Sequence, residues 1–321
     1  MLPLVSIITA CYNSAETIID TIASVSRQTY PHIEHIVVND GSSDQVEQLL
    51  TAYIEQGKII YLQKQNGGVS SARNLGARHA QGEFFVFLDA DDQLKPEYIE
   101  KCVQLLIDQP QVSLAITGVQ EFDAGHAQRQ LKYFNFGQFL FENVIPCAAM
   151  LRQKDFLAYG PYDEYMSFAE DWNLWISILK HQPTVAIVPE LLFLYRRHQN
   201  KQSLSVIADK QKHLLQKSHN QIYANHPALY SQYIQDSPLT LFLEQQRSRQ
   251  DSIKLYRKLK QQVLVASLVF LLAGIFITLQ AFYNQSGGFK IGGVFLIILG
   301  LIYYLMMKQS LQRSAKKTHR V

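Results

Sequence analysis

The stretch FFVFLDADD, residues 84–92, places five consecutive apolar residues directly before a group of three carboxylates. An uninterrupted apolar run of this length, rich in aromatic and β-branched residues and bounded by polar ones, is typical of a strand buried on both faces. Comparable runs elsewhere predict further strands of the same kind. These runs are Val5–Thr9, His35–Asn39, Ile59–Leu62 and Ser113–Thr117.

Helical patterns separate the apolar runs. Asn13, with Glu16 three residues later, resembles a capping box, and apolar residues at helical spacing follow it up to Val25. Two more helices are predicted from about Val69 to Ala80 and from Pro96 to Ile107. This alternation predicts an α/β fold, with a Rossmann-like, mostly parallel sheet flanked by helices.

Polar or acidic segments directly follow four of the predicted strands. Each of them taken alone has an ordinary explanation as turn or helix-capping chemistry. In a parallel sheet, however, the carboxyl ends of the strands meet at one edge, and ligands bind there. We therefore expect the four segments to form one site. They are Ala10–Asn13, Asn39–Asp44, Asn66–Asn74 and Asp89–Asp92.

The residue types at this edge suit a nucleoside diphosphate. The carboxylates of Asp89–Asp92 would form an oxygen site of the kind that Mg²⁺ or Mn²⁺ prefers, and such a cation neutralises a diphosphate leaving group. Arg73, near a glycine-rich turn and a helix start, would add a bidentate phosphate contact. Tyr12 and Asp40 would stack on a nucleobase and hydrogen-bond to it.

The four segments, in this order and spacing, resemble family two glycosyltransferases with the GT-A fold. The resemblance covers about residues 3–200. It implies the transfer of a sugar from a nucleotide-diphosphate sugar, most often a UDP-sugar, with inversion and with Mn²⁺ or Mg²⁺ as cofactor. The matching segments are PLVSIITACYN (3–13), HIVVNDGSSD (35–44), NGGVSSARNLG (66–76) and FLDADD (87–92).

Carried over by position, the resemblance assigns two sets of donor-side residues. Asp89 and Asp91 form the family's DxD motif, and Asp91 is the direct metal ligand. The metal ligands implied in this way are Asp91, Asp89 and His198. The nucleotide-sugar-binding residues implied are Ala10, Tyr12, Asp40, Arg73, Asp89 and Arg197.

Two positions depart from the family pattern. Ala10 and Cys11 stand where the family commonly has Pro-Thr, and Asn39 stands where it commonly has an aspartate. Neither change removes a charge that the chemistry needs, but both would alter the preference for the nucleotide.

The segment SFAEDWNLW, residues 167–175, resembles the family's Glu-Asp motif at a helix start. Displacement at an anomeric carbon in one step needs a carboxylate opposite the leaving group, which takes the proton of the acceptor hydroxyl. The resemblance assigns that catalytic role to Asp171, with Glu170 in support. The alternative is that both acids only stabilise a helix N-terminus through its dipole.

The segment YRRH, residues 195–198, followed by Ser203, resembles the family's Tyr-Arg-x-His loop. That loop closes over the diphosphate, so His198 would be a metal ligand and Arg197 a phosphate contact. The alternative is a solvated basic loop.

Absent motifs narrow the functional class. No GxGxxG follows a strand, and GxxxxGK[ST] and HExxH are missing, which argues against dinucleotide oxidoreductases, P-loop enzymes and zinc proteases. The Gln-x-x-Arg-Trp motif of processive synthases is also missing, so one sugar per encounter is expected. Two alternatives stay open: a polyprenyl-phosphate sugar synthase, and a non-catalytic membrane-tethered scaffold that binds a nucleotide.

The C-terminal region carries two uncharged runs, 21 residues at Val263–Tyr283 and 17 residues at Ile291–Met307. As a helix, the first run would span about 30 Å, and the second is at the short limit. Six basic residues lie within 247–260 and five within 308–320, while the connecting loop holds only Lys290. By the positive-inside rule both flanks are cytoplasmic and the runs form a transmembrane hairpin. The alternative is a pair of buried core helices.

Composition and charge exclude several classes of protein and partner. The 321 residues, 47% hydrophobic and 18% charged, exclude disorder, and a net charge of +3 is too small to suggest a nucleic-acid partner. Three widely spaced cysteines exclude a disulfide framework and a cysteine-cluster zinc site. No Lys or Arg precedes Arg27, so the positive region of a signal peptide is missing. We expect a multi-pass protein of the cell (inner) membrane whose catalytic domain faces the cytoplasm and whose acceptor is a saccharide or lipid-linked saccharide.

The expected organisation has five parts. They are a nucleotide-sugar-binding half (1–117), an acceptor-binding half (118–225), a basic helical linker that lies along the membrane or is solvated (226–262), the hairpin (263–307) and a basic cytoplasmic tail (308–321).

Overall fold

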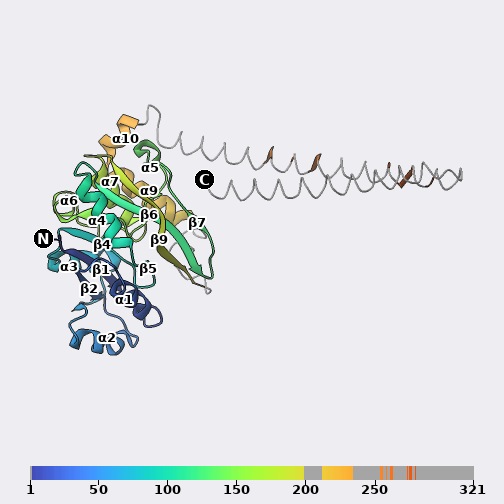
Figure 1. Ribbon diagram of the computed structural model, residues 1–321. Coiled ribbons are helices and arrows are strands. Elements are labelled where there is room, and N and C mark those ends of the chain that lie inside the picture. Colours follow the sequence, from blue (N-terminus) through green and yellow to red (C-terminus); the bar gives the residue numbers. More distant parts are fainter. Residues whose placement is uncertain are drawn as a thin grey trace. The chain divides into compact units, whose positions relative to one another are not determined.

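Four parallel strands build the N-terminal half of the sheet, in the order β3-β2-β1-β4 (Figure 1). The register pairs Cys11 with Asn39, and Asn39 with Gln63, so the carboxyl ends of β1, β2 and β3 meet at one edge. All four residues of β4 are buried, as its apolar run predicts. The strands are β1 (Val5–Cys11), β2 (Ile33–Asn39), β3 (Ile60–Gln63) and β4 (Phe84–Phe87).

This computed structural model describes residues 2–198, 212–233, 254–255, 258, 261–262, 273, 275–276 and 279. Its contacts divide the chain into two units, residues 1–233 and 234–321. The sheet, its helices and the site below all belong to the first unit.

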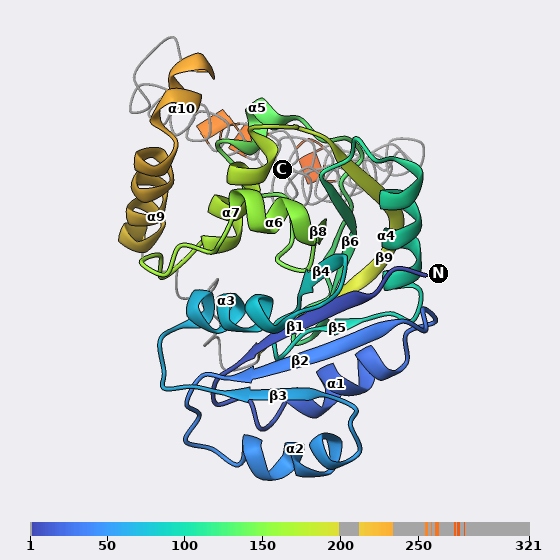
Figure 2. The same ribbon diagram turned by 90° about the vertical axis from the view of Figure 1, so that its left-hand side faces the viewer.

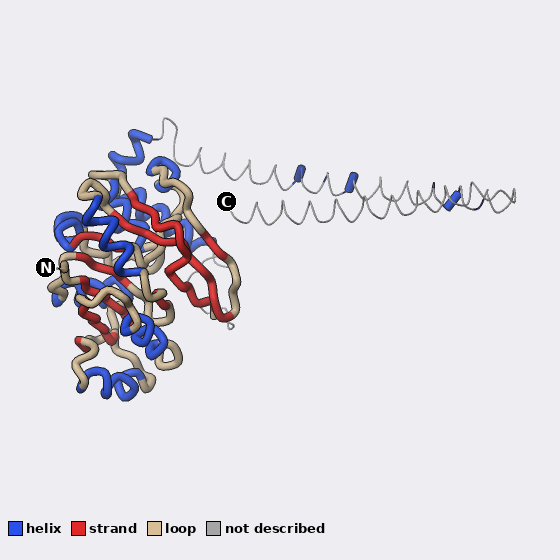
Figure 3. Tube along the Cα trace, viewed as in Figure 1, coloured by secondary structure: helices blue, strands red, loops and turns tan. Residues whose placement is uncertain are grey.

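The second half of the sheet corrects the expectation of a mostly parallel arrangement. β8 (Met150–Arg152) lies antiparallel between β4 and β6 (Leu114–Asp123), while β6 runs parallel to β9 (Val185–Arg197). Figure 3 draws the strands of this sheet in red. The short strands β5 (Gln93–Leu94) and β7 (Gln128–Arg129) are antiparallel to β9 and β6. A strand as short as β8, with three residues, leaves no periodic signal in a sequence.

Helices cover both faces of the sheet (Figure 2). Alternate strand residues face opposite sides, so Val37 packs with α1 and α2 while Val38 lies against α3. α4 joins the side of α1 and α2, and α6 packs its Phe156 ring on Phe85 and Phe87 from the side of α3. The helices are α1 (Ile18–Ser26), α2 (Val46–Glu55), α3 (Val69–His79), α4 (Tyr98–Asp108), α5 (Phe136–Phe139), α6 (Gln153–Tyr159), α7 (Glu170–Leu179), α9 (Lys212–Asn225) and α10 (Pro227–Tyr233).

The predicted capping box at Asn13 is wrong. α1 begins at Ile18, and Asn13 has a left-handed backbone with φ of 50°. Its side-chain oxygen accepts a hydrogen bond from the backbone N–H of Ser43 at 2.8 Å, in the loop after β2. The side chain is therefore engaged with the neighbouring loop, and the helix starts one turn later.

Gly76 allows α3 to approach the sheet closely. A Cβ atom at this position would lie 2.5 Å from Ile8 Cγ2 and 3.1 Å from Val38 Cγ2.

We predict that Gly76→Ala destabilises the protein by about 1–3 kcal/mol, because overpacking forces the helix off the strands. Thermal unfolding compared with that of Gly57→Ala, where the added Cβ meets no atom within 4 Å, checks this result. Gly57 has a positive φ, so its alanine variant reports backbone strain without a clash. An unfolding temperature of Gly76→Ala equal to or above that of the wild type would contradict the packing argument.

The predicted hairpin at 263–307 falls outside the described residues, apart from four single positions, and the tail at 308–321 falls wholly outside them. Within the residues that are described, no helix combines the length and apolar character needed to cross a bilayer. α10 and a few single positions are described within the predicted linker 226–262.

Candidate active site

The loops after β1 and β2 are tied to each other at the carboxyl edge of the sheet. The backbone N–H of Asn13 donates to Ser42 Oγ at 3.0 Å, and the backbone N–H of Ala15 donates to Asp44 Oδ2 at 2.9 Å. Just before Asn13, Tyr12 is 52% exposed, and Ala10 at the end of β1 is half-buried. The edge thus presents an open aromatic ring beside a fixed backbone, which suits stacking on a nucleobase.

Asp40 fixes the glycine-rich turn. Its carboxylate accepts hydrogen bonds from Lys64 Nζ at 2.7 Å, from Gly67 N–H at 3.0 Å and from Gly68 N–H at 2.8 Å, and the residue is only 3% exposed. A carboxylate at this point is also stabilised by the N-terminal dipole of α3. Asp40 therefore holds the start of the helix that carries Arg73. The hydrogen bond from Asp40 to a nucleobase stays a prediction. It would use the carboxylate lone pairs that Lys64, Gly67 and Gly68 leave free.

Arg73 joins the two halves of the site. Its side chain is 2% exposed, and it donates from Nη2 to Asp89 Oδ1 at 2.6 Å and from Nη1 to Glu170 Oε1 at 2.7 Å. The guanidinium also lies over the ring of Tyr162, 5.1 Å from its centre. The planar guanidinium of an arginine can donate to two carboxylates at once, which suits this bridging position. A lysine ammonium could form a good hydrogen bond with only one of them. The DxD motif and the Glu-Asp motif therefore share one buried cation.

Asp171 lies at the N-terminus of α7, directly after Glu170. Its Oδ1 accepts the backbone N–H of Trp172 at 2.7 Å, and Asn143 Nδ2 lies 3.4 Å from both carboxylate oxygens. Burial, together with the like charge of Glu170, raises the pKa of Asp171 to about 7. A carboxyl group whose pKa lies near neutral pH suits general-base catalysis.

Asp91, on the loop that follows β4, meets His198, which directly follows β9. The distance from Asp91 Oδ2 to His198 Nε2 is 2.7 Å, so residues 107 positions apart present an oxygen and a nitrogen ligand side by side. Burial and the neighbouring charge of Asp89 raise the pKa of Asp91, because concentrated negative charge disfavours its ionisation. A bound divalent cation would relieve this repulsion, so this donor set fits the Mn²⁺ or Mg²⁺ that the fold family implies.

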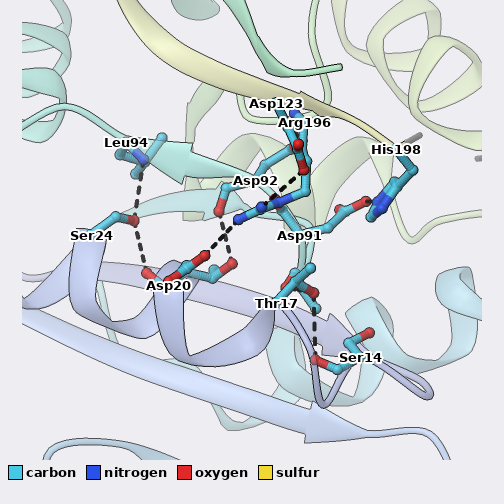
Figure 4. A network of polar contacts seen from close by, with 12 residues as sticks. Ser14, Thr17, Asp20, Ser24, Asp91, Asp92, Leu94, Asp123, Arg196 and His198 are labelled. Atoms are coloured by element: carbon cyan, nitrogen blue, oxygen red, sulfur yellow. Dashed lines mark hydrogen bonds and ion pairs between the residues drawn. The ribbon is translucent and has the colours of Figure 1, made fainter. Parts of the chain in front are cut away.

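Arg196 is a site residue that the sequence analysis missed (Figure 4). Its backbone N–H donates to Asp92 Oδ1 at 2.8 Å, and its Nε donates to the backbone oxygen of Asp91 at 2.8 Å. Its Nη2 forms an ion pair with Asp20 of α1 at 2.7 Å. The DxD loop is thereby fastened to β9 and α1. The adjacent Arg197 forms an ion pair with Glu121 at 2.8 Å. Its expected contact with phosphate stays a prediction.

We predict that Arg196→Gln weakens the apparent affinity for Mn²⁺ by about 10–100-fold, the usual loss when a group that orients a ligand is removed. The Mn²⁺ dependence of turnover measures this effect, with Arg78→Gln on the exposed end of α3 as control. Rescue by Arg196→Lys is expected to be partial, because a lysine lacks the fork that reaches both Asp91 and Asp20. An unchanged Mn²⁺ requirement in Arg196→Gln would show that the contact does not position the loop.

The geometry defines a class of protein. The parallel half of a mixed sheet ends in an exposed tyrosine, a glycine-rich turn and an acidic loop, and the second half adds two more acids. This is the layout that the resemblance to the GT-A fold predicts. Comparison with known proteins agrees: residues 6–165 match the family described as Glycosyl transferase family 2.

Relatives establish the family. The putative teichuronic acid biosynthesis glycosyltransferase TuaG of Bacillus subtilis (strain 168) is 30% identical over 205 residues, which cover 60% of this chain and 79% of TuaG. This chain belongs to glycosyltransferase family 2. An uncharacterized glycosyltransferase of Rickettsia typhi is 34% identical over 194 residues, covering 56% of this chain, and the chain spans 59% of that relative's length.

A solved structure shares the fold. S. aureus TarS, residues 1–349, in complex with UDP-GlcNAc superposes with a TM-score of 0.54 at 21% identity, covering 61% of this chain and 59% of TarS. At this level of identity the likeness concerns the fold, and the ligand belongs to TarS.

Proposed function

We propose that this protein is an inverting, metal-dependent glycosyltransferase that moves one sugar from a nucleotide-diphosphate sugar to a hydroxyl of a saccharide or lipid-linked saccharide. The observation that carries the proposal is the buried bridge from Asp89 through Arg73 to Glu170, which puts the donor motif next to Asp171. A UDP-sugar is the expected donor, in keeping with the UDP-GlcNAc held by TarS.

In the proposed reaction Asp171 removes the proton from the acceptor hydroxyl. The hydroxyl oxygen then bonds to the anomeric carbon as the bond from that carbon to the diphosphate oxygen breaks, which inverts the configuration. Arg73 keeps Glu170 and Asp89 in place by charge and hydrogen bonding. Asp91, Asp89 and His198 would hold Mn²⁺ or Mg²⁺, and the bound cation would neutralise charge on the diphosphate.

Cell-surface polysaccharide assembly is the proposed setting. TuaG is named for teichuronic acid biosynthesis, and the predicted hairpin at 263–307 would place the catalytic domain at the cytoplasmic face of the cell (inner) membrane, beside a lipid-linked acceptor. Transfer to the phosphate of a polyprenyl carrier is the runner-up, because the same hairpin would bring that phosphate to the same surface.

The test uses the full chain in detergent with Mn²⁺ and a panel of radiolabelled UDP-, GDP- and dTDP-sugars. Each donor is offered with a lipid-linked saccharide, a polyprenyl phosphate and a water-soluble saccharide. We expect a UDP-sugar to label the lipid-linked saccharide most. Labelling of the polyprenyl phosphate alone would favour the runner-up, and equal labelling of the soluble saccharide would contradict a membrane acceptor. Metal-independent nucleotide binding without turnover of any donor would identify a scaffold.

A further inference from the structure

A cysteine lies beside two acids of the DxD loop. One carboxylate oxygen of Asp89, one of Asp92 and the Sγ of Cys147 all lie within 4.8 Å of one another. The distance from Cys147 Sγ to Asp89 Oδ2 is 3.5 Å. Ligands around a tetrahedral zinc ion, with bonds of roughly 2.0–2.3 Å, are also about 3.5 Å apart. The cluster is therefore close to the dimensions of a metal site before any cation enters.

Other contacts occupy one oxygen of each carboxylate and leave the second one available. Asp89 Oδ1 is taken by Arg73, which leaves Oδ2 to face the thiol. Asp92 Oδ1 accepts the backbone N–H of Arg196. Asp92 Oδ2 is buried and has no hydrogen-bond partner among the described residues, in a side chain that is fully buried. An orphaned carboxylate oxygen in the interior costs free energy, and a cation is one of the few groups that compensates it.

Charge and access also suit a divalent ion. Once deprotonated by a bound cation, two carboxylates and a thiolate would carry three negative charges, of which Arg73, 2.6 Å from Asp89, would balance one. A divalent cation would balance the other two. The side chain of Asp89 is 34% exposed and Cys147 is partly exposed, so the cluster can be reached from solvent.

We propose that Asp89, Asp92 and Cys147 bind a thiophilic divalent cation of the Zn²⁺ class, at a site that shares Asp89 with the proposed Mn²⁺ site but uses neither Asp91 nor His198. Sulfur is a poor ligand for Mg²⁺ and a good one for Zn²⁺, so the thiol sets the selectivity. Cysteine spacing excluded a cluster of several cysteines but carries no information about one cysteine with two distant carboxylates. Binding replaces the thiol proton with the cation and releases that proton to solvent.

Occupancy would affect transfer, because Asp89 belongs to the proposed donor site. A cation that draws Asp89 Oδ2 toward Cys147 would compete with the donor and its Mn²⁺, so Zn²⁺ would inhibit. This consequence rests on the proposed function, whereas the binding site itself does not.

The test titrates the full, metal-stripped chain with Cd²⁺, a thiophilic probe whose bond to a thiolate gives an ultraviolet charge-transfer band. The wild type is expected to show a band that saturates at one equivalent and that excess Zn²⁺ removes. Cys147→Ala is expected to lose the band and to bind Zn²⁺ at least about tenfold more weakly. Cys102→Ala, which removes a fully buried thiol of the α4 core, is the matched control and should keep the band.

A second variant separates the two metal sites. Asp91→Asn should keep the cadmium band, because Asp91 faces His198. Absence of a band in the wild type, or a band that survives in Cys147→Ala, would overturn the proposed site. Inhibition is then measured for each protein against its own zinc-free rate, and Cys147→Ala is expected to be less sensitive to Zn²⁺. A band with no detectable transfer from any donor would sink the proposed function and leave the cation site standing.

Discussion

Asp171→Asn is expected to lower sugar transfer by about 10²–10⁴-fold, the range over which a positioned general base accelerates proton transfer. The asparagine keeps the shape of the side chain and can still accept the backbone N–H of Trp172, so the start of α7 should be preserved. Donor affinity should therefore change little, because the substitution removes only the group that takes the acceptor proton. Rates under saturating donor and acceptor, with nucleotide binding measured separately, check both statements.

The matched control is Asp155→Asn on α6. This carboxyl is also partly buried, and burial also raises its pKa, but it has no part in the proposed chemistry. It should keep near-normal turnover. Near-normal turnover in Asp171→Asn would contradict the assignment of the base.

The same carboxyl group predicts the pH dependence of the reaction. The pKa of Asp171 is raised to about 7, chiefly by burial and then by the negative charge of Glu170. The positive charge of Arg73 lowers the pKa in part, and the negative charge of Asp89 raises it further. A base works in its deprotonated form, so transfer should rise with pH up to about 7 and then level off. The rate at saturating substrates across this range measures it. A flat profile, or one that falls with pH, would be incompatible with Asp171 as the base.

Arg73→Met is expected to destabilise the protein by about 3–5 kcal/mol, because it leaves the carboxylates of Glu170 and Asp89 without their shared cation. Glu170 is the more deeply buried of the two, so it dominates this cost. Urea unfolding of the full chain in detergent, followed by tryptophan fluorescence, measures the change. Arg73→Lys should be intermediate, since it keeps the charge but not the fork.

A double-variant cycle sharpens this result. Arg73→Met leaves the buried carboxylate of Glu170 without a cation, and adding Glu170→Gln removes that unpaired charge. The double variant should therefore lose less unfolding free energy than the sum of the losses in the two single variants. Additive costs, or a cost of Arg73→Met below about 1 kcal/mol, would show that the bridge does not hold the two halves together.

The N-terminal half of the fold could be predicted because its signals are local. Apolar β-branched runs and the polar residues that end them identify β1, β2, β3 and β4, and their parallel pairing follows from the helices between them. The position of Asp89 and Asp91 beyond the end of β4 follows from the same reasoning.

The second half could not be predicted in the same way, because its arrangement depends on long-range contacts. β8 has three residues, and its place between β4 and β6 is set by pairing partners far along the chain. Asn143 near Asp171 lies in a segment without any motif. Arg196 pairs with Asp20 of α1 and Arg197 with Glu121 of β6. These partners lie far from β9 along the chain, so the sequence does not show which acid each arginine meets.

The most direct test of the account is a structure of the full chain with Mn²⁺ and an intact UDP-sugar. Our account predicts the diphosphate on the cation beside Asp91 and His198, and Asp171 on the opposite face of the anomeric carbon, with room for an acceptor hydroxyl between them. A nucleotide bound away from Arg73 and Asp91, or Asp171 on the same side of the sugar as the diphosphate, would contradict it.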